Sequence, residues 1–381
     1  MKKILIIGGG IGGLCAAIAL QRKGFEAHVY EKATVIKALG AGLSLSVNAV
    51  LALRQIGLDE ELMKAGQTLR YMNIPDQWGK LITQTDIEPV ARQFGAANFS
   101  IHRAVLHEIL MSHLQEGSLH LGKSFSHVTQ DAQEVRVDFE DGTQAVGEVL
   151  LAFDGIHSAV RGQLLPEVKP RYAGYTCWRA VIDYRPAAMQ ENQATETWGK
   201  AGRFGIVPLK NNKIYWFATV NAPEQDAYMR SFGVEELKKH FKEYHSPIPE
   251  ILSHTRNEQL LWNDIIDLKP IGKYVFGRVV LAGDAAHATT PNMGQGACMA
   301  IEDAIVLANQ LAQLNDVEKA LQRYEAMRMK RTQQIVRTSY QLGKVAQWEN
   351  GVLSVLRNAA LRRMPESVRQ KQIKELYDVV L

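Results

Sequence analysis

Short apolar runs and amphipathic stretches alternate over the first 31 residues of the chain. Ile4 to Ile7 is an apolar run of strand length, and Leu14 to Lys23 carries apolar side chains at helical spacing. Gly24 ends that helix, and Glu26 to Tyr30 has the composition of a second strand. The pattern predicts a strand, a helix and a second strand that form one parallel unit.

The pattern changes in the middle of the chain and later returns. Tyr175 to Asp183, Arg203 to Leu209 and Lys213 to Val220 are predicted to be strands of an antiparallel sheet. After residue 277 an apolar strand is again followed by a helix, from Ala297 to about Leu311. The alternation predicts an α/β (α+β) fold, with a Rossmann-like domain interrupted by an antiparallel sheet and followed by C-terminal helices.

These changes of pattern also predict the domain boundaries. We expect a nucleotide-binding domain in residues 1–170, with small inserted strands near 66–100. A sheet domain for the substrate should take residues 171–270, and residues 271–381 should return to the first domain and add the C-terminal helices. Within the first segment, Ser46 is expected to cap a helix from Val47 to Ile56.

Composition and charge exclude several classes of function. The chain has 381 residues with 44 Lys+Arg and 40 Asp+Glu, so the net charge is only +4, which does not favour nucleic acid as a partner. Its three cysteines, Cys15, Cys177 and Cys298, have neither metal-site nor disulfide spacing, and indicate a reducing cytoplasm. No stretch is apolar enough for stable membrane insertion, and the first apolar run is too short for a signal peptide. We expect a monomer or a weak homodimer.

The first turn carries the pattern Gly8-x-Gly10-x-x-Gly13 between the predicted strand and helix. The first glycine allows a tight turn, the second lets a pyrophosphate approach the backbone, and the third lets helix and strand pack closely. Free N–H groups at the helix N-terminus favour phosphate charge. Glu31, at the end of the second strand, can accept hydrogen bonds from ribose hydroxyls. The complete unit makes a ligand-free glycine turn an improbable alternative.

Two further motifs follow predicted strands, at the edge where open α/β sheets bind ligands. Asp154-Gly155 follows the strand Val149 to Phe153 and begins a segment that ends at Arg161. Gly283-Asp284 follows the strand near 277–282, and Gly294 and Gly296 precede the next helix. Arg103 lies in the first turn of another predicted helix. A cation there opposes the helix dipole, so the residue either lies on neutral surface or is kept for a ligand.

Three residues are candidates for contact with a substrate. Arg203 lies on a predicted strand, where it either anchors an anionic or carbonyl-bearing substrate or is a surface charge at the edge of the sheet. Tyr215, on the facing strand, is likewise either part of the pocket or at the surface. His287 could act as a base, although a histidine packed under a loop is the favoured interpretation. Val352 to Leu361, with Arg362 and neighbouring arginines, is amphipathic, and could touch a membrane surface or pack on the fold.

The three glycine- and acid-bearing motifs together resemble the signatures of class A, single-component flavin monooxygenases, the relatives of para-hydroxybenzoate hydroxylase. Gly174 to Arg179 and Gln347-Trp348-Glu349 are similar to a subgroup that contains alkylquinolone 3-monooxygenase, FAD-dependent urate hydroxylase and zeaxanthin epoxidase. The motifs occur in the family's order and span almost the whole chain. Phe153 departs from the pattern, because a small residue commonly precedes the Asp-Gly pair.

The resemblance implies FAD as cofactor and NADH or NADPH as co-substrate. By matching position, Arg103 would contact the FAD phosphates, Asp154 would serve both FAD and NAD(P)H, and Asp284 would bind the ribityl chain. The Gly294–Gly296 turn would lie by the flavin ring. The residues that would hold the adenosine diphosphate half are Gly8, Gly10, Gly13 and Glu31.

The resemblance further implies an NAD(P)H- and O2-consuming hydroxylase that transfers oxygen from a flavin C4a-hydroperoxide. Its alternatives are an epoxidase or flavin-dependent reductase of a polyisoprenoid-type substrate, and a non-catalytic FAD-binding module. The inserted sheet is rich in aromatic residues, each of which either belongs to the core or stacks on a small planar organic substrate, an aromatic or heteroaromatic molecule. These residues are Trp178, Phe204, Tyr215, Trp216 and Phe217. Gly40 to Leu43 is expected to approach something flat.

Overall fold

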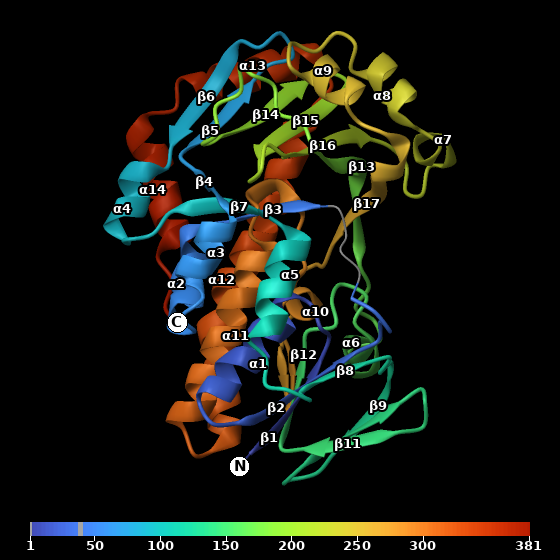
Figure 1. The fold of residues 1–381 in the computed structure, drawn as a ribbon, viewed down its shortest axis with the longest axis vertical. Coiled ribbons are helices and arrows are strands. Elements are labelled where there is room, and N and C mark those ends of the chain that lie inside the picture. The colour runs from blue at the N-terminus through green and yellow to red at the C-terminus, as the bar shows by residue number, and fades with distance from the viewer. Residues whose placement is uncertain (1, 37–40) are drawn as a thin grey trace.

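A computed structural model describes residues 2–36 and 41–381. A six-stranded sheet lies at the bottom of Figure 1 and a seven-stranded sheet at the top, and the long helices α11 (Gly296–Gln313) and α12 (Val317–Ala346) run between them. This arrangement confirms the predicted α/β class. We expected the backbone of Gly40 to Leu43 to approach a flat ligand. Gly40 lies outside the described residues, so the structure describes only Ala41 to Leu43 of this segment.

The six-stranded sheet has the order β18-β19-β12-β1-β2-β8. Its four central strands, β19, β12, β1 and β2, pair in parallel, so their carboxyl ends meet at one edge. Helix α1 packs between this sheet and α11, and both helices bury apolar side chains in the largest core of the protein. The bounds are β1 (Lys3–Ile7), α1 (Ile11–Arg22), β2 (Glu26–Glu31), β8 (Leu119–Leu121), β12 (Val149–Ala152), β18 (Val275–Phe276) and β19 (Val279–Leu281).

The seven-stranded sheet has the order β17-β13-β16-β15-β14-β5-β6. All its pairs are antiparallel except β14 with β5. Residues 71–86, expected to be small strands of the first domain, thus extend the seven-stranded sheet, which is built from two separate segments of the chain. The bounds are β5 (Tyr71–Pro75), β6 (Leu81–Asp86), β13 (Arg171–Ile182), β14 (Gln193–Gly199), β15 (Gly202–Pro208), β16 (Ile214–Asn221) and β17 (Leu261–Asp267).

Smaller elements complete the fold. Two three-stranded sheets have the orders β3-β7-β4 and β11-β10-β9, and the second of them contacts β1 through β11. The short helices α8 and α9 pack on one face of the seven-stranded sheet. The strands are β3 (Gly42–Leu45), β4 (Gln67–Leu69), β7 (Asn98–His102), β9 (Phe125–Gln130), β10 (Val135–Phe139) and β11 (Gln144–Gly147). The helices are α2 (Val47–Gln55), α3 (Asp59–Ala65), α4 (Glu88–Gln93), α5 (Arg103–Ser112), α6 (Ala159–Leu164), α7 (Ala227–Arg230), α8 (Val234–His240), α9 (Ile248–Ser253), α10 (Asp284–His287), α13 (Gly351–Arg362) and α14 (Glu366–Tyr377), with 3₁₀ turns at Asn257–Gln259 and Pro291–Met293.

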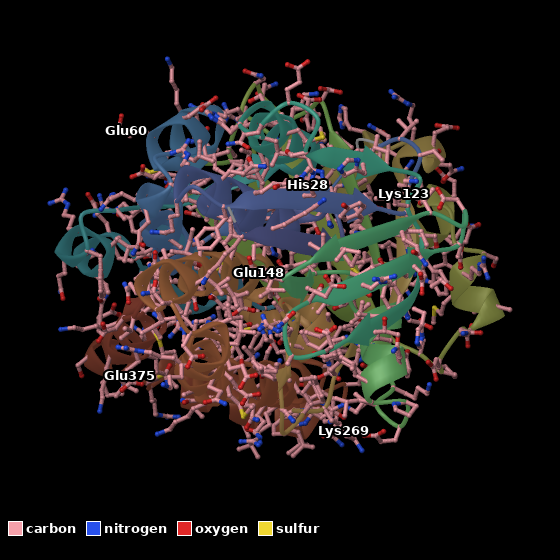
Figure 2. All side chains as sticks on the ribbon, turned by 90° about the horizontal axis from the view of Figure 1, so that it is seen from below. His28, Glu60, Lys123, Glu148, Lys269 and Glu375 are labelled. Carbon is pink, nitrogen blue, oxygen red and sulfur yellow. The ribbon has the colours of Figure 1, made fainter. Side chains whose placement is uncertain are left out.

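Charged side chains of both signs are distributed around the protein surface. In Figure 2 the labelled Glu60, Lys123, Lys269 and Glu375 lie at separate places around the outline, in agreement with the small net charge. Among the described residues, no helix is both long and apolar enough to cross a bilayer.

A buried ionic network joins α11 to α12. Arg328 is only 1% exposed and lies 2.6 Å from Glu302 Oε2 and 2.7 Å from Asp303 Oδ1. Arg331 approaches Glu302 from the side at 2.9 Å, and His287 Nε2 lies 2.6 Å from Asp303 Oδ2. Burial by itself would raise the pKa of Asp303, but His287 and Arg328 outweigh it and hold that pKa at about 2. The carboxylates therefore depend on their cations.

We predict that Arg328→Met destabilises the protein by about 3–5 kcal/mol, because it removes a buried cation that neutralises two buried carboxylates. The free energy of unfolding, from urea titration, is the measurement. Arg337→Met is the matched control, since Arg337 is exposed on the same helix and its change should stay within about 0.5 kcal/mol. Equal stabilities of the two variants would contradict a structural role for the network.

Candidate active site

The glycine turn leaves one open position beside two crowded ones. Gly8 has φ of +106°, and a Cβ there would lie 2.4 Å from the carbonyl oxygen of Phe153. A Cβ on Gly13 would lie 2.0 Å from the carbonyl oxygen of Gly8. Gly10, by contrast, would meet nothing within 4 Å. Two glycines are thus required by the packing of the protein, whereas the third keeps open space at the N-terminus of α1, which fits a ligand's pyrophosphate.

A cavity of about 330 Å³ opens at the carboxyl ends of β12, β1 and β2. Gly8, Gly10, Glu31 and Asp154 all belong to its wall, so the structure brings the first two sequence motifs together. We call it the strand-end cavity. Its position at the carboxyl edge of a parallel sheet is the usual one for nucleotide ligands.

Glu31 is oriented by the backbone around it. Its Oε2 accepts a hydrogen bond from the N–H of Gly9 at 2.7 Å, and its Oε1 accepts one from the N–H of Ala33 at 2.9 Å. Each carboxylate oxygen has a further lone pair, so the residue can still accept bonds from a ribose. The side chain therefore has a fixed direction before any ligand binds.

Asp154 has one satisfied and one unsatisfied oxygen. Its Oδ2 accepts a bond from the N–H of Val160 at 3.2 Å, whereas its Oδ1 is buried and has no partner among the described residues. Burial raises the pKa of this carboxyl group, and bonds from Ser158 and the backbone oppose that shift. A buried polar atom without a partner is unfavourable, which fits a group that receives a ligand's hydrogen bond.

Arg161 connects the second motif to the third. It is buried and donates hydrogen bonds to the carbonyl oxygens of Ile156 and, at 3.0 Å, Ala285. The unusual Phe153 also fits this junction, because its ring packs where a side chain on Gly12 or Gly283 would otherwise lie. The departure from the family pattern is thus accommodated by two glycines.

Asp284 and Arg103 are neighbours on facing elements. The side chain of Asp284 is accessible, yet desolvation raises its pKa, while His287 and Arg103 lower it. For Arg103, desolvation lowers the pKa, as does the charge of Arg179, and Asp284 opposes both. Gly296 is close as well, since its Cβ would lie 3.9 Å from Asp284 Oδ1.

The N-terminus of α11 is fixed against α2. Gln295, fully buried before the helix, donates to Ser46 Oγ at 3.1 Å and accepts from Asn48 Nδ2 at 2.9 Å. Gly294 has φ of +63°, which turns the chain into the helix at Gly296. No acidic residue lies in the first helical turn, so its free N–H groups can face negative charge.

The strands of the seven-stranded sheet direct alternate side chains to opposite faces. Trp178, Phe204 and Trp216 are completely buried in the core beneath α8 and α9. Only Tyr215 and Phe217, of the five aromatic residues expected at a planar ligand, lie on the other face. The other three follow the core alternative and cannot stack on a ligand at the second face, because successive residues of a strand point to opposite sides.

Arg203 and Tyr215 lie on that second face. Arg203 is only 3% exposed, and its Nη1 lies 2.8 Å from Glu196 Oε1 while its Nε donates to Gln347 Oε1 at 3.2 Å. Its guanidinium also lies over the ring of Tyr175, 5.3 Å from the centroid. Arg203 is thus neither a surface charge nor a free one. Tyr215 packs on β3, and burial raises the pKa of its hydroxyl, which therefore stays protonated.

His287 does not lie on this face. It is 2% exposed, and its Nε2 is used by Asp303 in the network between α11 and α12. This geometry agrees with the packed-histidine interpretation and gives no support to a role as substrate base, which stays a prediction.

Sequence reasoning included Arg179 in the motif Gly174 to Arg179 but did not name it as a candidate for substrate contact. On this face of the sheet it is the arginine whose guanidinium has the fewest partners among the described residues. It pairs with Phe217 across the sheet, is half-buried, and forms no salt bridge within the described ranges 2–36 and 41–381. Its Nε is buried without a hydrogen-bond partner there. Its charge lowers the pKa of both Arg103 and Tyr215. We call Arg103, Arg179, Tyr215 and Asp284 the central cluster. The available signal was a charged residue in the otherwise uncharged run Tyr175 to Ile182.

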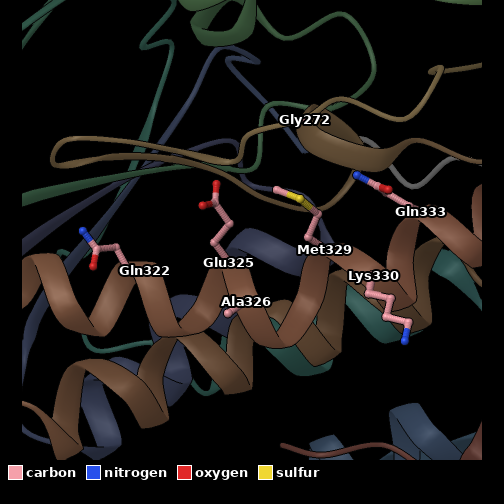
Figure 3. A pocket seen from close by; sticks show the side chains of 7 residues that line it. All are labelled: Gly272, Gln322, Glu325, Ala326, Met329, Lys330 and Gln333. Carbon is pink, nitrogen blue, oxygen red and sulfur yellow. The ribbon is translucent and has the colours of Figure 1, made fainter.

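A second hollow, of about 420 Å³, lies away from these motifs along α12 (Figure 3). Two of its polar side chains have structural tasks: Glu325 accepts bonds from the N–H groups of Tyr274 and Val275, and Gln333 donates to the carbonyl oxygen of Ile271. The part of the chain that the structure describes contains no cluster of three or more His, Cys, Asp or Glu residues able to hold a metal ion.

Comparisons with known proteins agree with this geometry. A family model described as "FAD binding domain" matches residues 1–339. The aurachin C monooxygenase/isomerase of Stigmatella aurantiaca is 39% identical over 361 residues, 95% of this chain and 94% of that protein. The 2-heptyl-3-hydroxy-4(1H)-quinolone synthase of Pseudomonas aeruginosa is 30% identical over 379 residues, 98% of this chain and 97% of that protein.

A solved structure has the same fold. Klebsiella pneumoniae HpxO, complexed with FAD and uric acid, has a TM-score of 0.92 and 31% sequence identity to this chain. The match covers 99% of this chain and 96% of that one. The open glycine turn, the unpartnered Asp154 oxygen and the accessible Asp284 all fit FAD. The chain belongs to the FAD binding domain family and is an FAD-dependent monooxygenase of the aromatic hydroxylase type.

Proposed function

We propose that this monooxygenase hydroxylates a carbon atom of a planar heteroaromatic or phenolic substrate that carries an ionised or enolic oxygen. The observation that carries the proposal is Arg179, an uncommitted guanidinium beside Tyr215 and Phe217 on the sheet face. Aromatic rings favour a flat ligand, and an unpaired cation favours its ionised oxygen.

Two relatives support this substrate class. HpxO was solved in complex with uric acid, and the Pseudomonas enzyme is named for a 3-hydroxy-4(1H)-quinolone. Both molecules are planar nitrogen heterocycles that carry oxygen on the ring.

We infer that Gly8, Gly10, Gly13 and Glu31 hold the adenosine diphosphate part of FAD, since they surround the strand-end cavity or shape its turn. In the same proposal Arg103 neutralises phosphate charge and Asp284 accepts bonds from the ribityl hydroxyls. FAD held by these residues would supply the redox chemistry, in which the two electrons of NAD(P)H reduce O2 so that one oxygen atom enters the substrate and the other leaves as water.

The chain's own groups would support that chemistry in two ways. The N–H groups at the start of α11, beside Gly294 and Gly296, stabilise negative charge on the cofactor without reorganisation. The sheet face, with Arg203 held by Glu196 and Gln347, excludes water and keeps the substrate in a fixed orientation. Asp154 lies at the strand-end cavity and is the proposed contact for both FAD and NAD(P)H. The binding of NAD(P)H is transient, because the chain has a single dinucleotide motif.

A cytoplasmic location belongs to the same proposal. Cys15, Cys177 and Cys298 are all buried and unpaired, which suits a reducing compartment.

Simultaneous measurement of O2 uptake and NAD(P)H oxidation tests the proposed function. The probes are uric acid, a 4(1H)-quinolone and salicylate, each assayed with and without catalase. Substrate-stimulated O2 uptake that yields a hydroxylated ring supports the proposal. NAD(P)H oxidation stimulated only by a polyisoprenoid, with an epoxide or reduced product, would instead support the alternative.

For the glycine turn, we predict that Gly10→Ala leaves the apoprotein as stable as the wild type but weakens FAD binding at least about tenfold, since the new methyl group enters open ligand space. Gly13→Ala should lower the thermal midpoint of the apoprotein, because its Cβ meets the backbone of Gly8. Thermal unfolding without FAD and flavin fluorescence titration are the measurements. A stable Gly13→Ala apoprotein, or normal FAD affinity in Gly10→Ala, would contradict this division.

For Asp154, we predict that replacement by Ala slows flavin reduction by NAD(P)H about tenfold and changes FAD affinity less, because one charged acceptor at the cavity is lost. Stopped-flow absorbance gives the reduction rate, and equilibrium titration gives the affinity. Asp154→Asn keeps an acceptor for Val160 and serves as the structural control. Reduction of Asp154→Ala at the wild-type rate would remove the residue from the nicotinamide site.

For Arg179, we predict that replacement by Gln raises the KM for the ionisable substrate by about 10- to 100-fold, the effect of one lost charge-assisted hydrogen bond. Arg179→Lys keeps the charge and should lose less. Arg230→Gln, on the outer part of the same domain, is the matched control. An unchanged KM in Arg179→Gln would place the anion site elsewhere.

We also expect Arg203→Ala to increase peroxide release, because the substrate is held less well.

A further inference from the structure

Helix α13 exposes a continuous apolar face. Val352, Val355 and Leu356 are 69%, 67% and 60% exposed, and Leu353 is 42% exposed. Their spacing puts three of them on one side of the helix over successive turns, with Ala360 continuing the row. The helix contains no carboxylate. Contiguous apolar surface of this kind on a folded protein marks a contact with something else.

The opposite side of α13 is firmly packed. Arg357 and Asn358 are buried, and Arg357 donates to the carbonyl oxygens of Val345 and Ala346. Arg362 pairs with Asp76 at 3.2 Å. The helix therefore has a fixed place on the fold, beside β6 in Figure 1, and its outer side is exposed while its inner side remains fully packed.

Unpaired cations surround the apolar face. Lys200 adjoins the first turn, since its Cε lies 3.3 Å from the Cβ position of Gly351, and Arg363 follows the last turn. Lys80 lies on the β5–β6 turn, next to Leu81, whose carbonyl oxygen accepts a bond from Arg362. Among residues 2–36 and 41–381, none of these three cations forms a salt bridge. The same turn exposes Trp78, 71% accessible, and Leu81, 46% accessible.

The nearby carboxylates are largely occupied. Asp76 is engaged by Arg362, Glu366 is engaged by Arg369, and Glu349 accepts a bond from Asn221. The surface that surrounds α13 is thus apolar in its middle and positive at its rim.

We propose that α13 docks this protein on an anionic lipid bilayer. The helix lies in the plane of the interface, with Val352, Val355 and Leu356 among the acyl chains and with Lys200 and Arg363 at the headgroups. An apolar stripe bordered by Lys and Arg is the chemistry by which interfacial helices bind such surfaces.

Charge favours lipid over a second copy of the chain. In a two-fold dimer the same face would meet itself, so Lys80, Lys200 and Arg363 would approach like charges with no carboxylate on α13 to compensate. Anionic headgroups supply the missing negative charge over a continuous surface.

Co-sedimentation of the FAD-loaded protein with vesicles tests the proposal. One set is pure phosphatidylcholine and the other contains roughly 30% phosphatidylglycerol. We expect binding to the anionic vesicles to exceed binding to the neutral ones about tenfold, and to fall in about 1 M salt, where charges are screened. The double variant Val355→Ser/Leu356→Ser should reduce anionic binding about tenfold, and Lys200→Gln/Arg363→Gln should abolish the preference for anionic lipid.

The matched control is Val35→Ser/Val380→Ser, which removes two other exposed valines of 63% and 75% accessibility and should bind like the wild type. All variants should keep the thermal midpoint and the NAD(P)H oxidation rate measured without vesicles. Equal binding of wild type and Val355→Ser/Leu356→Ser overturns the proposal. So does a wild type that binds neither kind of vesicle, or an α13 variant whose only change is a smaller oligomer in analytical ultracentrifugation, because the face would then join copies of the chain.

Discussion

The carboxyl ends of four parallel strands, β2, β1, β12 and β19, meet at one edge of the six-stranded sheet, and the arrangement of the site depends on this constraint. Glu31, the glycine turn, Asp154 and Asp284 each follow or form one of these ends. The turn at β1 can be this tight only because Gly13 lets α1 approach the carbonyl group of Gly8. Segments separated by hundreds of residues therefore place polar groups along one edge of the sheet without any long loop.

The first motifs could be predicted from sequence because their geometry is local. A strand, a glycine turn and a helix fix the positions of Gly8, Gly10 and Glu31 within one short segment. The aromatic residues of the inserted sheet were harder. Strand periodicity alone predicts that Tyr215 and Trp216 point to opposite faces of the sheet. Which of the two faces is core depends on α8 and α9, which cover only one face of the seven-stranded sheet. Local patterns do not state which face a distant helix covers.

Long-range pairing explains the remaining differences. Residues 71–86 join the seven-stranded sheet through the parallel pair of β14 with β5, a contact between segments far apart in the sequence. The partners of Arg203 are likewise distributed: Glu196 lies on the next strand, whereas Gln347 comes from the end of α12. His287 was a candidate base because it follows Gly-Asp, but its environment is set by Asp303 and Arg328 on two later helices. Sequence spacing contains none of this information.

Arg203 and Arg179 show how the same side chain on the same sheet face can have different physical roles. Arg203 is neutralised by Glu196, so its position and energy change little when a ligand arrives. Arg179 has no such partner among the described residues and lies near the like charge of Arg103. An unpaired, half-buried cation is unfavourable in the free protein, and an anionic ligand relieves that destabilisation as it binds. For an anionic substrate such as the one proposed above, the unfavourable free energy of Arg179 in the free protein would add to the affinity, so an arginine with few contacts is a better candidate for recognising charge than one that is already neutralised.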